Sequence, residues 1–310
     1  MNDITVSIFI LTYNQEQFIA QTIESILLQK TNFSFQLVIG EDCSTDATRI
    51  ICEKYARDFG GKIKLLPSLK KNIGLIANYM RTIKECDGKY IAICDGDDYW
   101  IDENKLQKQV DFLGKNLDYS IVFTKMKRLF SNGEFKEMIV ENQKNCTTFE
   151  DLIFNNFIPS VTVLFKNNQK NEKIPSWLIH FPYGDWPTYL WTIKDEGKIH
   201  FLDEVTAVYR IDIGISSRMR KVNSDVVRVN LNILKCIAND NSFSNKSHAV
   251  NESIFRTKKN VMASLNRDKK YRASFKMLFH IMLNYKQKYQ VAKLYLYSIH
   301  RTFENKNEAF

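Results

Sequence analysis

The chain has 310 residues, of which 44% are hydrophobic, 13% aromatic and 25% charged, the composition of a globular protein with a large core. No apolar run reaches the roughly 20 residues that a membrane-spanning helix needs, and we find no secretory signal peptide at the N-terminus. The six cysteines form no C-x-x-C pair, so we expect reduced thiols in a cytoplasmic protein rather than a disulfide framework or a zinc site.

The net charge of +9 is unevenly distributed. Residues 220–310 contain 18 Lys and Arg against 6 Asp and Glu, whereas residues 1–219 contain 26 against 29. We therefore expect two parts, an α/β domain over 1–219 and a basic, mainly α-helical region over 220–310. The basic region is open to three interpretations, which are contact with an anionic membrane surface, contact with nucleic acid, and an ordinary solvated helical surface.

Strand and helix patterns alternate over the first 95 residues. We expect strands at 6–11, 35–39, 62–66 and 89–94. Helices are expected after Asn14 as a possible N-cap, after Ser44 or Thr45 as a cap, and over 74–85. This alternation predicts βαβ units and a mostly parallel sheet. Neither Gly-x-Gly-x-x-Gly nor a Gly-Lys-Ser/Thr loop is present, which argues against a dinucleotide-binding Rossmann domain and against a P-loop.

Three polar segments follow strands of this predicted sheet, at 12–14, 41–46 and 95–98. Parallel strands bring their carboxyl ends together, so these segments are expected to converge. The third reads Asp95-Gly96-Asp97-Asp98, and carboxylates packed so tightly remain ionised together most easily around a hard cation such as Mg²⁺ or Mn²⁺. The alternative is an acidic turn, because Asp and Gly are common turn residues.

The second half of the domain carries one conspicuous carboxylate. We expect a helix over 103–117 and strands at 119–124, 161–165, 199–202 and 205–209. Between them Asp185 stands among aromatic residues, where a raised pKa would suit a general base. The alternative is a helix N-cap, since Trp186-Pro187 follow. From residue 224 onward the pattern is amphipathic and helical, which fits either a membrane-surface helix or a helical cap on the domain.

Together the segments 6–14, 39–46 and 95–98 resemble the family 2 inverting glycosyltransferases, which have the GT-A fold. The resemblance extends through Asp185 and Val208-Tyr209-Arg210 and covers about residues 4–220. It implies that Asp42 binds the nucleobase, that Asp97 or Asp98 binds Mn²⁺ or Mg²⁺, and that Asp185 is the catalytic base. The donor-binding residues implied are Thr12, Tyr13, Asn14, Glu41, Asp42, Asn72, Gly74, Asp95 and Arg210.

Two positions depart from the family pattern. Cys43 stands where glycine is commoner, and Asp212 stands near the place of a histidine that often ligates the metal. A metal ligand from that last loop is therefore not expected.

The resemblance implies transfer of a sugar from a nucleotide-diphosphate sugar, most simply a UDP-sugar, to an acceptor hydroxyl during surface polysaccharide synthesis. The acceptor would be a saccharide or a lipid-linked saccharide, with peripheral contact at the inner face of the membrane through the basic helices, and no nucleic acid is expected as a partner. Two alternatives stay open. A nucleotidyltransferase also uses an α/β fold and metal-binding carboxylates, and a binding protein could retain a transferase fold without catalysis.

Overall fold

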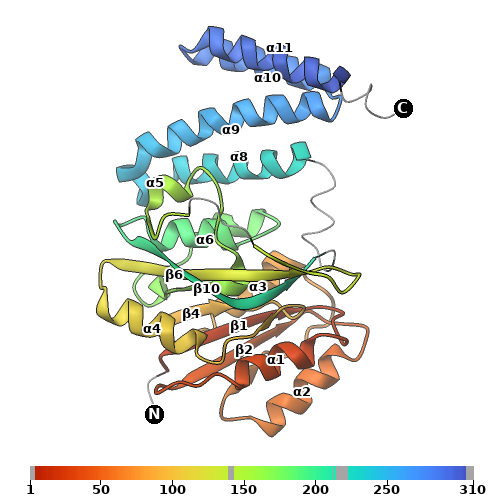
Figure 1. The fold of residues 1–310 in the computed structure, drawn as a ribbon, viewed down its shortest axis with the longest axis vertical. Helices are drawn as coiled ribbons and strands as arrows, with labels where there is room; N and C mark the ends of the chain where they lie inside the picture. Colours follow the sequence, from red (N-terminus) through yellow and green to blue (C-terminus); the bar gives the residue numbers. More distant parts are fainter. Residues whose placement is uncertain (1–3, 139–142, 212, 214–222, 305–310) are drawn as a thin grey trace. The chain divides into compact units, whose positions relative to one another are not determined.

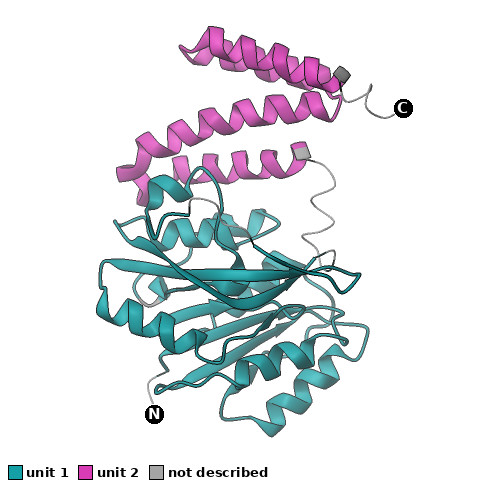
Figure 2. Cartoon of the chain, in the orientation of Figure 1, with its two compact units in different colours: residues 1–214 teal, residues 215–310 magenta. Residues whose placement is uncertain are grey.

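The computed structural model describes residues 4–138, 143–211, 213 and 223–304. The chain divides into two compact units, residues 1–214 and residues 215–310, coloured separately in Figure 2. The boundary predicted from charge, between 219 and 220, falls outside the described residues.

Unit 1 is an α/β unit with one sheet and helices on both of its faces (Figure 1). Its strands are β1 (Val6–Thr12), β2 (Phe35–Glu41), β3 (Ile63–Leu65), β4 (Tyr90–Ile93), β5 (Tyr99–Trp100), β6 (Tyr119–Leu129), β7 (Phe135–Glu137), β8 (Cys146–Thr147), β9 (Leu164–Lys166) and β10 (Lys198–Arg210). Its helices are α1 (Ile19–Leu27), α2 (Thr48–Asp58), α3 (Leu75–Ile83), α4 (Lys105–Lys115), α5 (Phe149–Leu152) and α6 (Asp185–Thr192), with 3₁₀ turns at Ser160–Thr162, Asn168–Lys170 and Ser176–His180.

The strand order is β3-β2-β1-β4-β9-β6-β10-β5, with β7 beside β6 and β8 beside β10. As predicted for the first 95 residues, β1 pairs in parallel with β2 and β4, and β2 pairs in parallel with β3. The other half is mixed, because β9 is antiparallel to β4 and β6, and β5 is antiparallel to β10. The two strands expected at 199–202 and 205–209 form one irregular strand, β10. The carboxyl ends of β1, β2 and β4 thus share one edge.

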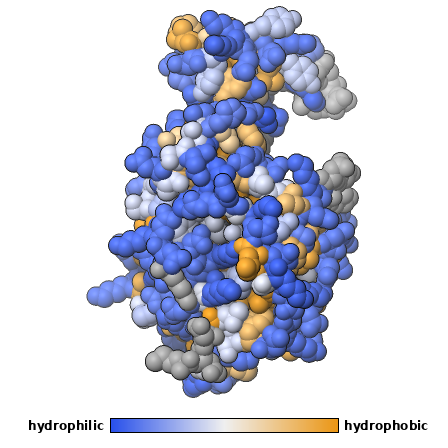
Figure 3. All heavy atoms as spheres, turned by 90° about the vertical axis from the view of Figure 1, so that its left-hand side faces the viewer, coloured by the Kyte–Doolittle hydropathy of each residue, from blue (hydrophilic) through white to orange (hydrophobic). Residues whose placement is uncertain are grey.

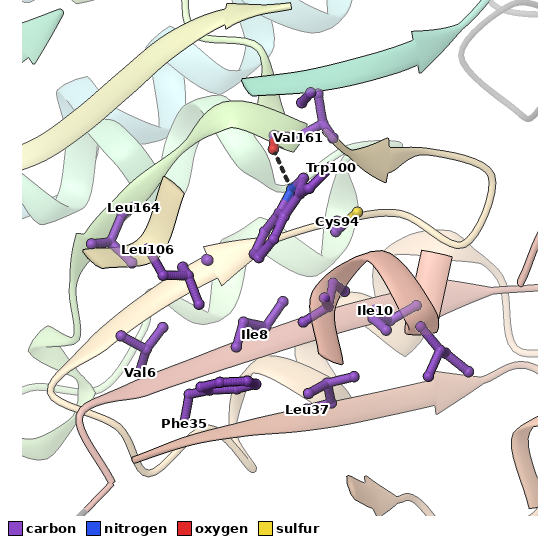
Figure 4. Packing of buried hydrophobic residues seen from close by; sticks show 14 of the residues in the cluster. Val6, Ile8, Ile10, Phe35, Leu37, Cys94, Trp100, Leu106, Val161 and Leu164 are labelled. Carbon is purple, nitrogen blue, oxygen red and sulfur yellow. Dashed lines mark hydrogen bonds between the residues drawn. The ribbon is translucent and has the colours of Figure 1, made fainter. Parts of the chain in front are cut away.

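Both faces of the central strands are buried, which explains their continuous apolar runs. Ile8 packs in the core cluster with α1 and α4, whereas Phe9 on the opposite face packs against Tyr79 of α3, with ring centroids 5.1 Å apart. Trp100 extends the cluster and donates its indole N–H to the carbonyl of Val161 at 2.9 Å (Figure 4). This anchor fixes β5 directly after the acidic segment 95–98.

Two of the predicted helix caps are wrong. Asn14 does not cap α1, which begins later in the chain and has no side-chain cap. Neither Ser44 nor Thr45 caps α2, because the carboxylate of Asp46 accepts from the N–H of Thr48 at 2.9 Å. Short polar side chains at strand ends compete for the same backbone donors, so the sequence alone does not decide between them.

Unit 2 is helical, as predicted. It consists of α8 (Asn223–Asn239), a 3₁₀ turn (Asn241–Lys246), α9 (Ser247–Arg267), α10 (Tyr271–Asn284) and α11 (Lys288–Glu304). Helix α9 packs against α8, α10 and α11, and a small core of Phe255, Met262, Ile281 and Val291 lies among α9, α10 and α11. In the described part of the chain, no helix combines the length and apolar content needed to cross a membrane.

Candidate active site

The three polar segments that follow β1, β2 and β4 are joined by backbone hydrogen bonds. The N–H of Asp42 donates to the carbonyl of Thr12 at 3.0 Å, and the N–H of Gly96 donates to the carbonyl of Leu11 at 2.9 Å. The convergence expected from a parallel sheet is therefore present at this edge.

The turn after β1 is held by side-chain contacts with the loop after β2. Asn14 has a φ of 52°, its side-chain oxygen accepts from the N–H of Thr45 at 2.8 Å, and its own N–H donates to Ser44 Oγ at 3.0 Å. Thr12 is buried, and its hydroxyl has no hydrogen-bond partner among the described residues. Tyr13 is exposed. Asn14 thus braces the loop, while Thr12 and Tyr13 leave polar and aromatic groups for a ligand.

Asp42 organises the segment from Asn72 to Gly74. Its Oδ1 accepts from the N–H of Ile73 at 2.8 Å and its Oδ2 from the N–H of Gly74 at 2.9 Å, while the Asn72 amide donates to the Asp42 carbonyl at 3.0 Å. Gly74 has a φ of 86°, a conformation that favours glycine. The structure thus brings together Asp42, Asn72 and Gly74, which the resemblance assigned to one pocket.

Glu41 supports this loop from inside the protein. It is 1% exposed, and its Oε1 accepts from the N–H of Ser44 at 2.6 Å while Oε2 lies 3.8 Å from Arg49. Cys43, which lies between Glu41 and Ser44 in the chain, has a φ of 58°. A residue with a Cβ pays about 1 kcal/mol or more in this left-handed conformation, which explains physically why glycine is the commoner choice there.

The acidic segment 95–98 is clamped against α1 and the turn after β1. The hydroxyl of Thr22 lies 3.0 Å from the carbonyl oxygen of Gly96 and 2.6 Å from that of Asp98. A Cβ on Gly96 would lie 2.5 Å from Gln15 Oε1 and 2.8 Å from Thr12, so glycine is required for this close approach. The loop that carries the carboxylates is therefore built to a tight fit.

Burial and mutual repulsion disfavour ionisation of the carboxylates in this segment. Burial, with added repulsion from Asp97 and Asp185, raises the pKa of Asp95 to about 8. Burial also raises the pKa of Asp97 and of Asp98, and repulsion from the other two carboxylates adds to the effect at Asp98. Oδ2 of Asp98 is buried without a partner in the described part of the chain. An oxygen-rich cluster of this kind fits a hard divalent cation.

A cation at this place would need oxygen ligands from a bound molecule as well. Among the described residues, no group of three His, Cys, Asp or Glu side chains is arranged to hold a metal ion by itself. Mg²⁺ is often bound by one or two carboxylates together with substrate phosphates. The arrangement therefore fits a metal shared with a phosphate-bearing ligand. Asp212, singled out in the sequence, lies outside the described residues.

Arg210 lies at the end of β10 and braces the acidic segment. Its backbone N–H donates to Oδ1 of Asp98 at 3.0 Å, and its guanidinium donates to the carbonyl of Asp97. The guanidinium is 4.6 Å from the ring centroid of Phe18 and 4.9 Å from that of Tyr99. Arg210 is 8% exposed and supports the Asp97 backbone, while the donor contact implied by the resemblance stays a prediction.

Asp185 is the first residue of α6 and Gly184 is the N-cap, so the alternative interpretation of Asp185 as the cap is wrong by one residue. Burial raises the pKa of the Asp185 carboxyl, although the amide of Asn156, which donates to its Oδ2 at 3.0 Å, partly offsets this. The Asp185 carboxylate in turn contributes to the raised pKa of Asp95, so the two groups lie within electrostatic reach. A partly exposed, oriented carboxylate with a raised pKa is suited to accept a proton.

Asn156 is the site residue that the sequence analysis missed. It lies in an irregular segment before the 3₁₀ turn at Ser160–Thr162, with neither periodicity nor a recognisable motif. Its hydrogen bond with Asp185 joins residues that are 29 positions apart in the chain, so it is visible only in the folded structure. Its asparagine side chain alone carried no signal that could have distinguished it from other loop residues.

Comparison with known proteins places the chain in a family. The model of glycosyl transferase family 2 matches residues 7–182. An uncharacterized protein of Mycobacterium tuberculosis is 31% identical over 206 residues, 66% of this chain and 58% of that protein. The chain thus spans less than two thirds of the length of that relative.

Solved structures show the same fold. The crystal structure of residues 1–349 of TarS from Staphylococcus aureus with UDP-GlcNAc has a TM-score of 0.60 at 20% identity, covering 96% of this chain and 80% of that chain. A mannosyltransferase from Pyrobaculum calidifontis with GDP-Man and Mn²⁺ has a TM-score of 0.57 at 14% identity, covering 100% and 90%. The fold is GT-A, as the sequence predicted. With its family model covering more than half of its residues, the chain belongs to glycosyl transferase family 2.

Proposed function

We propose that the chain is an inverting glycosyltransferase that moves a sugar from a nucleotide-diphosphate sugar to an acceptor hydroxyl. The observation that carries this proposal is the partly exposed carboxylate of Asp185, held by the Asn156 amide at 3.0 Å and within electrostatic reach of Asp95 in the acidic segment of a family 2 transferase. Inversion needs a base on the acceptor side and charge stabilisation on the leaving-group side. Asp185 is the candidate for the base, and the acidic segment 95–98 is the candidate for the side of the leaving group.

The donor is proposed to bind along the carboxyl edge of β1, β2 and β4. The residues proposed to bind the donor come from the segments that meet at this edge and from the end of β10. They are Thr12, Tyr13, Asn14, Asp42, Asn72, Gly74, Asp95 and Arg210, with Glu41 supporting the loop from inside the protein. The TarS complex with UDP-GlcNAc supports a UDP-sugar as the donor. The complex of the mannosyltransferase with GDP-Man shows that the fold also accepts another nucleotide. A screen of nucleotide-sugars would identify the donor of this chain.

Asp97 is proposed to bind a divalent cation, Mn²⁺ or Mg²⁺. Asp98 is less accessible, because its Oδ1 accepts from the backbone of Arg210 and it is 1% exposed against 8% for Asp97, but its Oδ2, which has no partner among the described residues, makes it the second candidate ligand. The Mn²⁺ in the mannosyltransferase structure supports a metal in this fold. Such a cation, when bound, stabilises the negative charge of a departing diphosphate.

Asp185 is proposed to accept the proton of the acceptor hydroxyl. The acceptor oxygen forms a bond to the anomeric carbon while the bond between that carbon and the diphosphate oxygen breaks on the opposite face, which inverts the configuration. Burial makes Asp185 a stronger base, and the contact with Asn156 holds one of its oxygens in place. Orientation of this kind contributes much of the rate in such reactions.

The proposal is tested by measuring nucleotide-diphosphate release with a panel of nucleotide-sugars. Asp185→Asn and Asp97→Asn are each expected to lower the rate by about 100-fold or more, because each removes a charge required for proton transfer or leaving-group stabilisation. Asp111→Asn, on the exposed side of α4, is the matched control and should retain full activity. Full activity of Asp185→Asn would show that the base lies elsewhere.

Product analysis separates the alternatives. A glycosyltransferase releases a nucleoside diphosphate and a glycosylated acceptor, whereas a nucleotidyltransferase releases pyrophosphate. A binding protein on a transferase fold turns over no donor, with or without acceptor.

The acceptor is proposed to be a saccharide or a lipid-linked saccharide in surface polysaccharide synthesis, reached at the cytoplasmic face of a membrane. Helix α10 exposes Phe275, Phe279 and Leu283, which recur every four residues along one face. Residues 271–302 contain six Lys and Arg and no Asp or Glu. Hydrophobic side chains also reach the surface among hydrophilic ones in Figure 3. An apolar stripe with basic flanks suits the surface of an anionic membrane.

A further inference from the structure

Unit 2 contains a cavity that the proposed transfer reaction does not use. Its volume is about 480 Å³, and its lining comes from the C-terminal part of α9, the turn that follows it, and α11. These elements pack on one another within the unit. The cavity therefore depends on no contact with unit 1.

The charges that line this cavity are all positive. Arg267, Lys269 and Arg301 line it, and no Asp or Glu does. Among the described side chains, none of these three cations forms an ion pair. Asp268 is the one carboxylate between residues 253 and 303, and its Oδ2 accepts from the N–H of Ser224 at 3.0 Å. Three unpaired cations around one cavity repel each other, and a bound anion would relieve that repulsion.

The neutral lining complements these charges. The hydroxyl of Tyr297, a residue that is 57% exposed, has no hydrogen-bond partner in the described part of the chain and can donate to a ligand. Ser298 and Thr302 already donate to carbonyls of their own helix, at 2.8 and 2.6 Å. Leu294 and Ala263 add an apolar wall. The cavity thus offers cations and one phenol to an anion, and an apolar surface to the carbon atoms attached to it.

Lys269 stands at a backbone position that favours glycine. Its φ is 59°, in a turn closed by the N–H of Lys269 to the carbonyl of Asn266 at 2.9 Å and the N–H of Lys270 to that of Leu265 at 2.7 Å. A side chain there is conformationally costly. An ammonium group needed at the rim of the cavity would account for a lysine in place of glycine.

We infer that this cavity is a second ligand site and that it binds a phosphate-bearing group other than the donor nucleotide. Guanidinium groups match the oxygens of phosphate in bidentate fashion, and phosphate has enough oxygens to engage three cations and a phenol together. The apolar wall suits the carbon atoms that carry the phosphate, for which glycerol is the smallest probe common to soluble molecules and lipid headgroups. The phosphate can belong to a soluble molecule or polymer or to a lipid headgroup, since the recognised chemistry is the same.

Binding to the full chain tests this site. Two probes are used, sn-glycerol 3-phosphate in calorimetry and vesicles containing phosphatidylglycerol in sedimentation. The double variant Arg267→Gln with Arg301→Gln is expected to weaken the response by about tenfold or more, because both guanidinium groups are lost. The matched control, Arg228→Gln with Lys235→Gln, removes two exposed charges from α8 of the same unit and should bind as wild type does.

The outcomes are distinct. A selective loss with glycerol 3-phosphate supports the site and a soluble source, and a selective loss with vesicles alone supports it and a lipid headgroup. The inference is overturned if neither probe binds, if both double variants lose binding equally, or if saturating UDP displaces glycerol 3-phosphate. Circular dichroism and the melting temperature verify that each variant folds. If the double arginine variant does not fold, the same measurements are made with Tyr297→Phe, which removes one exposed hydroxyl.

Discussion

Asp97 and Asp98 are neighbours in the chain, but their carboxylates have different surroundings. Asp98 is engaged by the backbone of β10, whereas only the carbonyl of Asp97 is engaged by Arg210. The carboxylate of Asp98 is thus tied to β10 through one oxygen, whereas that of Asp97 has a side-chain hydrogen bond with Gln15 and, among the described residues, none with β10. At the scale of single residues, the hydrogen-bond partners of the two carboxylates differ although the residue type is the same.

Removal of the metal tests the proposed role of Asp97. Treatment with EDTA is expected to abolish nucleotide-diphosphate release, and added Mn²⁺ should restore it, because the carboxylates alone cannot stabilise the leaving group. Turnover that is insensitive to the chelator would remove the cation from the proposal.

Lys105 provides a test of electrostatics in the core. It is fully buried, its ammonium lies 4.1 Å from the ring centroid of Trp100, and it donates to Gln109 at 2.9 Å. Burial lowers its pKa from 10.5 to about 7. Between about pH 7 and pH 10 the unfolded chain binds this proton and the folded chain does not, so the contribution of Lys105 to the free energy of unfolding rises with pH across that window.

The expected result is a difference between variants. The free energy of unfolding of wild type minus that of Lys105→Met should increase from pH 7 to pH 10 by a few kcal/mol, as measured by urea titration. Lys108→Met, which removes an exposed ion-paired lysine of the same helix, should show no such increase. A flat difference for Lys105→Met would mean that its ammonium stays charged in the folded protein.

At the scale of elements, the start of α6 depends on a close approach to α3. A Cβ on Gly184 would lie 2.8 Å from the ring of Tyr79, which packs on Phe9 and donates to Thr188 at 3.1 Å. Its contacts with Phe9 and Thr188 keep the Tyr79 ring from moving away from an added Cβ. Asp185 can therefore take its position only because the preceding residue, Gly184, has no side chain.

Gly184→Ala is expected to lower the free energy of unfolding by about 1–3 kcal/mol through overpacking, and to lower the rate of transfer by displacing the helix start. Gly114→Ala is the control, because a Cβ there meets nothing within 4 Å and should stabilise α4 by about 0.5 kcal/mol. Urea midpoints and initial rates measure both effects. Unchanged stability and activity in Gly184→Ala would contradict this account.

The elements of the first 95 residues could be predicted because each buried strand there is followed by a helix with its own apolar period. In the later half α4, β6 and β10 could also be predicted, but β5, with two residues, was too short for a pattern, and the strand expected at 161–165 is divided between a 3₁₀ turn and the three residues of β9. The insertion of β9 between β4 and β6 depends on long-range pairing. The motif residues of the site could be recognised because each motif is a short local pattern. The contacts of Asn156 with Asp185 and of Arg210 with Asp97 join distant parts of the chain, so the sequence could not show them.

At the scale of the whole molecule, the charge asymmetry and the exposed stripe on α10 lead to one prediction. Phe279→Ser with Leu283→Ser should lower partitioning onto phosphatidylglycerol vesicles by about tenfold, because two apolar side chains are lost from the contact. The control, Ile50→Ser with Phe135→Ser, removes two exposed apolar side chains from unit 1 and should have no effect. Equal partitioning of both variants would place the contact elsewhere.

The acidic segment is completed by a partner far along the chain. Oδ1 of Asp98 accepts from the backbone of Arg210, 112 positions later, and β5 pairs with β10. A nascent chain that ends before β10 already carries every carboxylate proposed for the metal and the base, but not the strand that orders them. Because loop closure over so long a stretch of chain is slow, we expect the acidic segment to take its final arrangement only after β10 has been added to the sheet.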